Sequence, residues 1–248
     1  MIVLFTDFGV SGPYVGQMKA VLYRQAPNVP IVDLFADAPT FDPQLAAYLL
    51  AAYVNEFPPD SVFLCVVDPG VGNISRRPVV VKVDGRWFVG PDNGLFNMVC
   101  LHAADPEKIQ WWEILWRPQA LSNSFHGRDL FAPVAAQLAT EKMPSCKELD
   151  VLQCINTDWP QDLAKIVYID DFGNAMTGIR ADTLEHDSKL NVKGKVLSRA
   201  RTFSEVAVGS GFCYENSNGL LEVAVNQGRA DKTFDLHVGD LVAVELHS

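Results

Sequence analysis

The sequence lacks the cysteine patterns that would define a disulfide framework or a cysteine-ligated metal site. Its five cysteines are odd in number and widely spaced, and none forms a CxxC pair. HExxH is also absent, so neither common zinc signature is present. Cys65 and Cys100 stand in apolar runs, which predicts small buried side chains. We therefore expect a reduced protein without a metal ligand set.

Positive charge and long apolar segments are scarce as well. The formal net charge is −10, whereas a nucleic-acid binder needs a basic face to displace counterions from phosphates. No apolar stretch approaches the roughly 20 residues that a membrane helix requires, and the start MIVLFTDFG has no basic region before a cleavage site. We expect a cytoplasmic protein that binds a small molecule, with neither nucleic acid nor membrane as a partner.

Glycine-rich cofactor motifs and a nucleophile elbow are missing too. Gly9, Gly12 and Gly16 do not fit GxGxxG, and the glycines of PGVG at 69–72 fit neither that pattern nor a P-loop. Ser210 in VGSGF is not a GxSxG elbow. A dinucleotide site, a P-loop and a serine triad are therefore unsupported.

The composition is that of a globular protein, with 48% hydrophobic and 20% charged residues. Apolar periodicity and turn residues divide the first part into alternating strands and helices. Asp42-Pro43 is typical of a helix start, SVFLCVV of a central parallel strand, and Asp84-Gly85 of a hairpin turn. The predicted elements are strand 2–6, helix 14–26, strand 29–34, helix 43–55, strand 61–67, hairpin strands 79–83 and 87–89, and helices near 94–103 and 131–142.

Beyond Pro144 the sequence pattern changes to short segments of alternating apolar and polar residues, separated by glycines. The first of these is a predicted strand at 165–169. We predict an amino-terminal α/β domain with a largely parallel central sheet at 1–158 and a smaller, mainly β carboxy-terminal domain at 159–248.

Candidate functional side chains follow the predicted strands of the first domain, where an α/β sheet places its ligand crevice. Asp7 and Asp68 each come just after a strand, although either could be a helix cap or turn residue. Arg76-Arg77 follows in the next loop and could equally be a solvated pair. His126, in FHGRD before a helix, could be structural, but histidine beside Arg and Asp can hold and deprotonate a water.

The second domain offers IDDFGN at 169–174. Asp170 could pair with an amine, Phe172 could stack on a planar base, and Asn174 could hydrogen-bond its edge. The alternative is a β-turn with Asn in a left-handed conformation. The polar turn NSNG at 216–219 allows the same two interpretations.

Taken in order, these stretches resemble the S-adenosylmethionine (SAM) hydroxide adenosyltransferase family, relatives of bacterial fluorinases and chlorinases. The segments that carry the resemblance are TDFG at 6–9, YVGQMK at 14–19, VVDPGVG at 66–72, FVGPDNGLF at 88–96, FHGRDLFAPVAAQLA at 125–139, IDDFGN at 169–174 and NSNGLLEVAVNQG at 216–228.

The resemblance implies hydrolysis of SAM to adenosine and methionine without a cofactor, in a homotrimer whose substrate lies at the subunit interface. The family's catalytic Asp-Arg-His set falls on Asp68, Arg76 and His126, with Arg77 as the alternative arginine because GNISRRP is one residue longer than the usual loop. The substrate-binding positions it implies are Asp7 for the ribose, Phe8 beside it, Asp170 and Ser217 for the methionine end, and Phe172, Asn174 and Phe203 for the adenine.

Two other functions stay open at this point. A chlorinase-like enzyme would use a halide as the nucleophile, and it is expected to lack the Asp-Arg-His set. A non-catalytic SAM or adenosine binder would keep the Asp170, Phe172 and Asn174 cradle without turnover.

Overall fold

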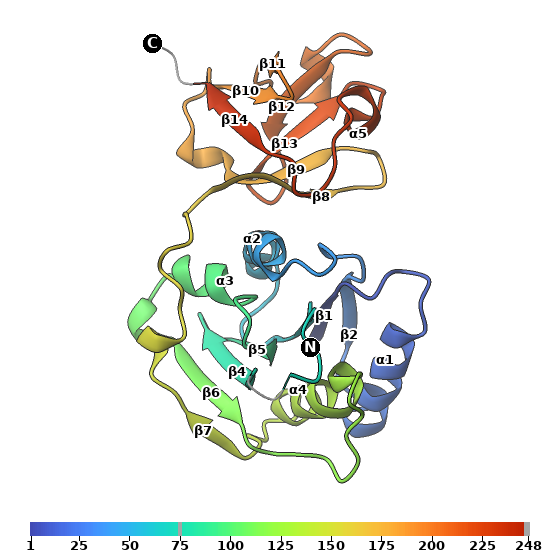
Figure 1. The fold of residues 1–248 in the computed structure, drawn as a ribbon, viewed down its shortest axis with the longest axis vertical. Coiled ribbons are helices and arrows are strands. Elements are labelled where there is room, and N and C mark those ends of the chain that lie inside the picture. The colour runs from blue at the N-terminus through green and yellow to red at the C-terminus, as the bar shows by residue number, and fades with distance from the viewer. Residues whose placement is uncertain (74–75, 246–248) are drawn as a thin grey trace. The chain divides into compact units, whose positions relative to one another are not determined.

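In the computed structural model, which describes residues 1–73 and 76–245, the chain divides after Trp159 into two units (Figure 1). The elements of the larger unit, Met1–Trp159, are β1 (Ile2–Thr6), α1 (Tyr14–Gln25), β2 (Ile31–Phe35), α2 (Pro43–Tyr53), η1 (Val54–Glu56), β3 (Val62–Val66), β4 (Pro78–Val83), β5 (Arg86–Pro91), α3 (Asn97–Leu101), η2 (Pro106–Lys108), β6 (Gln110–Ile114), η3 (Gly127–Phe131), α4 (Ala132–Ala139), β7 (Cys146–Glu148) and η4 (Val151–Gln153).

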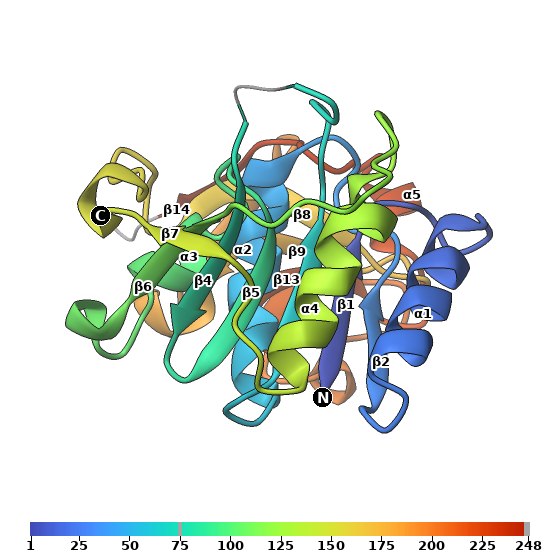
Figure 2. The same cartoon turned by 90° about the horizontal axis from the view of Figure 1, so that it is seen from below.

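The larger unit is built on a sheet with the strand order β2-β1-β3-β5-β4-β6-β7. β1 pairs in parallel with β2 and β3, and β3 pairs in parallel with β5. Every residue of β3 is buried, as its unbroken apolar run predicts for a strand covered on both faces. Helices α1 and α4 pack together on one face, and α2 and α3 lie on the other (Figure 2). The predicted α/β fold is confirmed, and the sheet is parallel across β2-β1-β3-β5 but antiparallel from β5 through β4 and β6 to β7.

Local sequence signals explain where several elements begin and end. The Asp42 side chain accepts a hydrogen bond from the Leu45 backbone N–H at 3.0 Å and caps α2, whose first residue is proline. Asp84 and Gly85 both have positive φ, at 46° and 79°, which is the two-residue turn that joins β4 to β5 in an antiparallel hairpin.

Three features of the larger unit differ from the prediction. The strands β6 and β7 were not predicted, because β6 has only two buried residues, with two half-buried ones between them, and β7 has none. The helix expected near 94–103 is only Asn97–Leu101. The helix expected near 131–142 is the shorter α4, and it is preceded by a π-helical turn, η3, that was not expected.

The smaller unit, from Pro160 onward, is mainly β, as predicted. Its two sheets are antiparallel, with the strand orders β12-β13-β9-β8 and β11-β10-β14. One hydrophobic core contains residues of both sheets. Its elements are β8 (Leu163–Ile169), β9 (Ala175–Arg180), η5 (Ala181–Thr183), β10 (Lys189–Val192), β11 (Lys195–Leu197), η6 (Phe203–Glu205), β12 (Gly211–Glu215), β13 (Leu220–Val225), α5 (Ala230–Thr233) and β14 (Val242–Glu245). Within the described ranges, no helix is both long and apolar enough to span a membrane.

Candidate active site

Asp68 lies just beyond the carboxyl end of β3, with only 4% of its side chain exposed. Its Oδ1 pairs with Arg76 and accepts the Gly70 backbone N–H at 3.2 Å. Its Oδ2 is buried and has no hydrogen-bond partner among the described residues. An unpartnered buried carboxylate oxygen is unfavourable on its own, so this atom is suited to receive a donor from a bound molecule.

The two candidate arginines have different partners. Arg76 is 11% exposed and forms the ion pair with Asp68, passing so close to Gly70 that a side chain at position 70 would collide with it. Arg77 is 41% exposed and donates through Nε to Asp92 at 2.9 Å. The geometry therefore associates Arg76, and not Arg77, with Asp68.

His126 immediately precedes the π-helical turn η3. This wider turn sets the direction of the backbone at His126 before the regular helix α4 begins, and such turns recur at functional sites. His126 lines two cavities, so its side chain is accessible to a ligand.

Burial and neighbouring charges shift the pKa values of His126 and Asp68. Burial lowers the pKa of His126 below its ordinary 6.5, Arg76 and Arg117 lower it further, and Asp68 opposes the change. Burial raises the pKa of Asp68, against the effects of Arg76, the Gly70 N–H and His126, and the charge of Asp7 raises it further. At neutral pH the His126 imidazole is therefore uncharged and able to accept a proton.

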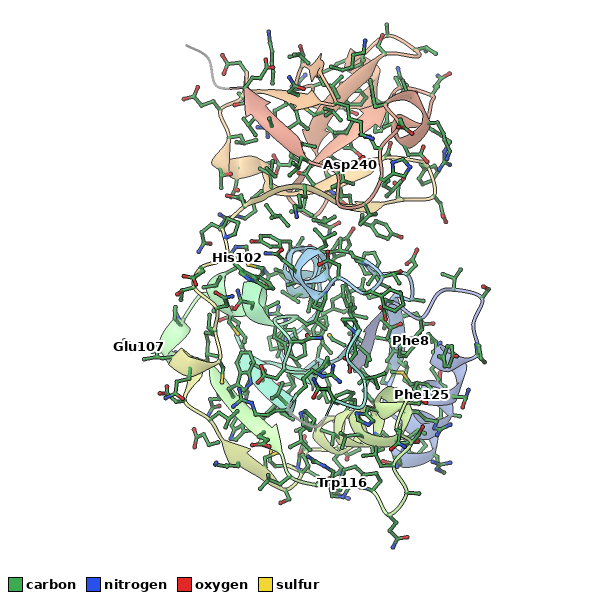
Figure 3. The ribbon with its side chains drawn as sticks, in the orientation of Figure 1. Phe8, His102, Glu107, Trp116, Phe125 and Asp240 are labelled. Carbon is green, nitrogen blue, oxygen red and sulfur yellow. The ribbon has the colours of Figure 1, made fainter. Side chains whose placement is uncertain are left out.

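Asp7, Phe8, Asp68 and His126 line one cavity of about 580 Å³ in the larger unit. Asp7 lies just beyond β1, its Oδ2 accepts the Phe41 backbone N–H at 3.1 Å, and burial raises its pKa. Phe8 and Phe125 meet edge to face at 5.8 Å and lie close together in Figure 3. A cavity of this size with aromatic walls and a few polar groups is typical of a small-molecule site.

A second cavity, of about 310 Å³, also reaches His126 and is lined by Arg76, Arg77 and Arg117. Since both cavities include His126, and Arg76 pairs with Asp68, the predicted catalytic set lies between them.

The smaller unit has its own cavity, of about 640 Å³, and four of the predicted substrate residues line it: Asp170, Phe172, Asn174 and Phe203. Phe172 is 77% exposed, which leaves its ring free to stack on a planar group.

IDDFGN is also a turn, between β8 and β9. Asp170 accepts the Asn174 backbone N–H at 2.8 Å and its side-chain amide at 3.1 Å. The residue with positive φ is Gly173, at 82°, and not Asn174, so the turn of the alternative interpretation is present but its left-handed residue is the glycine. Because Asn174 is held by Asp170, the turn stabilises two of the residues that line the cavity.

Ser217 is the predicted residue that the structure does not bring to this cavity. It is in the turn between β12 and β13, where its Oγ lies 3.1 Å from Asn218 Oδ1. Sequence reasoning missed Tyr214, which lines the cavity, and the buried Glu222 that holds it. A single acid within the apolar run LLEVAV was the available signal.

The described residues hold no cluster of three or more His, Cys, Asp or Glu side chains that could bind a metal ion. The chain thus combines an α/β unit, with a polar, aromatic-walled cavity at the carboxyl ends of its parallel strands, and a smaller, mainly β unit.

Comparison with known proteins identifies the family. The SAM hydroxide adenosyltransferase N-terminal domain model matches residues 2–148, and the corresponding C-terminal domain model matches residues 164–243. The chain belongs to the SAM hydroxide adenosyltransferase family.

Its relatives match over nearly their whole length. A Thermus thermophilus protein named (R)-S-adenosyl-L-methionine hydrolase is 38% identical over 96% of both chains, and one of the same name from Methanocaldococcus jannaschii is 30% identical over 98% of this chain and 95% of its own. A solved structure of an uncharacterized conserved protein from Thermotoga maritima has a TM-score of 0.83 and 30% identity, covering 98% of this chain and 99% of that one. A fluorinase from Nocardia brasiliensis is more distant, at 23% identity.

Proposed function

We propose that this protein hydrolyses SAM to adenosine and L-methionine, with Asp68, Arg76 and His126 as the catalytic residues. The observation that carries the proposal is the buried, unpartnered Oδ2 of Asp68 beside Arg76 and a neutral His126. The names of the relatives at 30–38% identity support the same reaction.

In the proposed reaction, Asp68 and Arg76 hold a water against the ribose C5′ atom. His126 accepts a proton from that water as its oxygen forms a bond to C5′. The C5′–S bond breaks and its electron pair goes to sulfur, which turns the sulfonium into the neutral thioether of methionine. Arg76 stabilises the negative charge that develops on the attacking oxygen. His126 then releases its proton to solvent.

The sulfonium is already a good leaving group, so the proposed reaction requires neither a metal nor another cofactor. Asp7 binds the ribose hydroxyls next to Phe8. Phe172, Phe203 and Asn174 hold the adenine, and Asp170 pairs with the methionine amine. Ser217 completes the methionine end, which requires its turn to reach the ligand.

We further propose that the active form is a homotrimer in the cytoplasm, with each substrate at a subunit interface. Each unit has a cavity lined by residues assigned to SAM, which supports a substrate site formed by more than one subunit. The five free cysteines suit a reducing compartment. Light scattering coupled to size exclusion tests the trimer, and a monomer at working concentration would contradict it.

The decisive experiment incubates the pure protein with SAM in halide-free buffer prepared with oxygen-18 water. Adenosine labelled at its 5′-hydroxyl, together with an equal amount of methionine, is expected. Unlabelled adenosine would contradict direct attack by water. Substrate binding without product would favour a binder, and formation of 5′-chloro-5′-deoxyadenosine only after chloride is added would favour a halogenating enzyme.

A further inference from the structure

Strand β13 of the smaller unit contains a buried acid that sequence reasoning did not single out. Glu222 is only 2% exposed, and its neighbours in the strand are buried apolar residues. Burying a carboxylate is unfavourable unless hydrogen bonds compensate for the lost water. The partners of Glu222 therefore indicate its role.

Each oxygen of the Glu222 carboxylate accepts a hydrogen bond from a side chain. Oε1 accepts a hydrogen bond from the Tyr214 hydroxyl at 2.5 Å, and Oε2 accepts one from the Asn216 side-chain amide at 2.9 Å. Tyr214 is directly opposite Glu222 in the antiparallel pair of β12 and β13, so the strand register itself brings the two side chains together.

The first partner belongs to the wall of the cavity in the smaller unit. Tyr214 lines this cavity, and its ring meets that of Phe203, another lining residue, at 5.3 Å between centroids. Glu222 does not line the cavity. Its hydrogen bond fixes the far end of the Tyr214 ring and thereby the surface against which Phe203 packs.

The second partner shapes the turn that carries Ser217. The Asn216 side-chain oxygen accepts the backbone N–H groups of Asn218 and Leu220, each at 3.0 Å. Its amide group donates to Glu222, so the whole side chain is held in one orientation. One carboxylate thus connects the aromatic wall of the cavity to the polar turn.

We propose that Glu222 is a positioning residue that sets both ends of the substrate site of the smaller unit, acting through Tyr214 at the adenine end and through Asn216 at the methionine end. The inference rests on the proposed function for the identity of the two ligands. Glu222 touches neither ligand. Burial is the main cause that raises the pKa of Glu222, and the nearby charge of Asp170 raises it further.

The test measures the binding of adenosine and of L-methionine separately, by calorimetry, with the full-length protein. Glu222→Met removes both hydrogen bonds and places an apolar side chain among the apolar residues of the strand. It is expected to weaken the binding of each ligand about tenfold, since a buried hydrogen bond contributes about 0.5–1.5 kcal/mol. Glu222→Gln keeps an oxygen for Asn216 and an N–H for the Tyr214 oxygen, and is expected to stay within about threefold of wild type.

Two further variants separate positioning from general damage to the unit. Tyr214→Phe removes only the hydrogen bond between Tyr214 and Glu222, and it should weaken the binding of adenosine but not that of methionine. Leu221→Met changes the neighbouring core residue and should leave both affinities unchanged. In turnover, Glu222→Met should raise KM and change kcat by less than about threefold, as expected for a residue that positions the site without taking part in the reaction.

Wild-type affinities in Glu222→Met, or unchanged adenosine binding in Tyr214→Phe, would overturn the positioning role while leaving the proposed function intact. Equal losses in Glu222→Met and Leu221→Met would also overturn it, because they would show only a disturbed core. A wild-type protein that binds neither adenosine nor methionine would overturn both the positioning role and the proposed function.

Discussion

Replacing Arg76 with alanine removes the cation that lies against the buried Asp68, and the neighbouring Arg77 supplies a matched control. Arg76 is 11% exposed, and its carboxylate partner is 4% exposed. Loss of one group that stabilises charge in a transition state lowers kcat by about 10²–10³-fold. Arg77 is 41% exposed and pairs with Asp92, so Arg77→Ala should lower kcat/KM by less than about threefold.

Stability should also separate the two variants. Breaking a buried ion pair from one side costs about 3–5 kcal/mol, but Asp68, whose pKa burial already raises, can take up a proton and reduce that loss. Arg77→Ala breaks a partly exposed pair worth about 0–1 kcal/mol, which shifts the Tm by about 4 °C at most.

The assay follows adenosine by liquid chromatography at saturating and limiting SAM, at a temperature well below both unfolding midpoints. Arg76→Lys, which retains the charge but not the forked geometry, should recover part of kcat. A larger loss in Arg77→Ala than in Arg76→Ala, or equal losses, would refute the assignment of Arg76 as the catalytic arginine.

Three other predictions concern pH and the two larger cavities. Because the pKa of His126 is lowered from 6.5, kcat/KM should stay constant as the pH falls to 6.5 and should decrease only at lower pH, where the imidazole gains a proton. A pH profile whose acid limb is unchanged in His126→Ala would contradict this. A side chain at Gly127 would come within 3.2–3.3 Å of Met18, Phe125 and Phe8, so Gly127→Val should raise KM for SAM severalfold, and an unchanged KM would place the substrate elsewhere. Phe172→Ala should weaken adenosine binding by about 1–3 kcal/mol, the value of a base stack, and change stability by less than about 0.5 kcal/mol because the ring is 77% exposed; calorimetry and thermal unfolding measure the two effects.

Strongly patterned parts of the chain could be predicted because local chemistry determines them. The apolar run of β3 predicted a central strand and placed Asp68 at its end, and Asp42-Pro43 marked the start of α2. The strands β6 and β7 escaped prediction because their pairing depends on β4 and on each other, and their own residues carry little apolar periodicity.

Side-chain partners were harder to predict than elements. Arg76 and Arg77 are adjacent in the sequence, and only the path of their loop sends one to Asp68 and the other to Asp92. Glu222 was missed because its hydrogen bonds to Tyr214 and Asn216 depend on the register between two strands. The proposed roles of these residues stay predictions until the variants are measured.

The π-helical turn before α4 also affects how this site tolerates insertions and deletions. An α-helix advances about 100° per residue, so removing one residue from Gly127–Phe131 and restoring regular helix would rotate His126 by about that angle relative to α4. The buried stripe of α4 would keep its register and the fold would survive. A deletion of one codon in this turn would therefore leave a folded protein in which His126 is no longer oriented toward Asp68. During evolution, the activity could be lost in this way while the fold is retained.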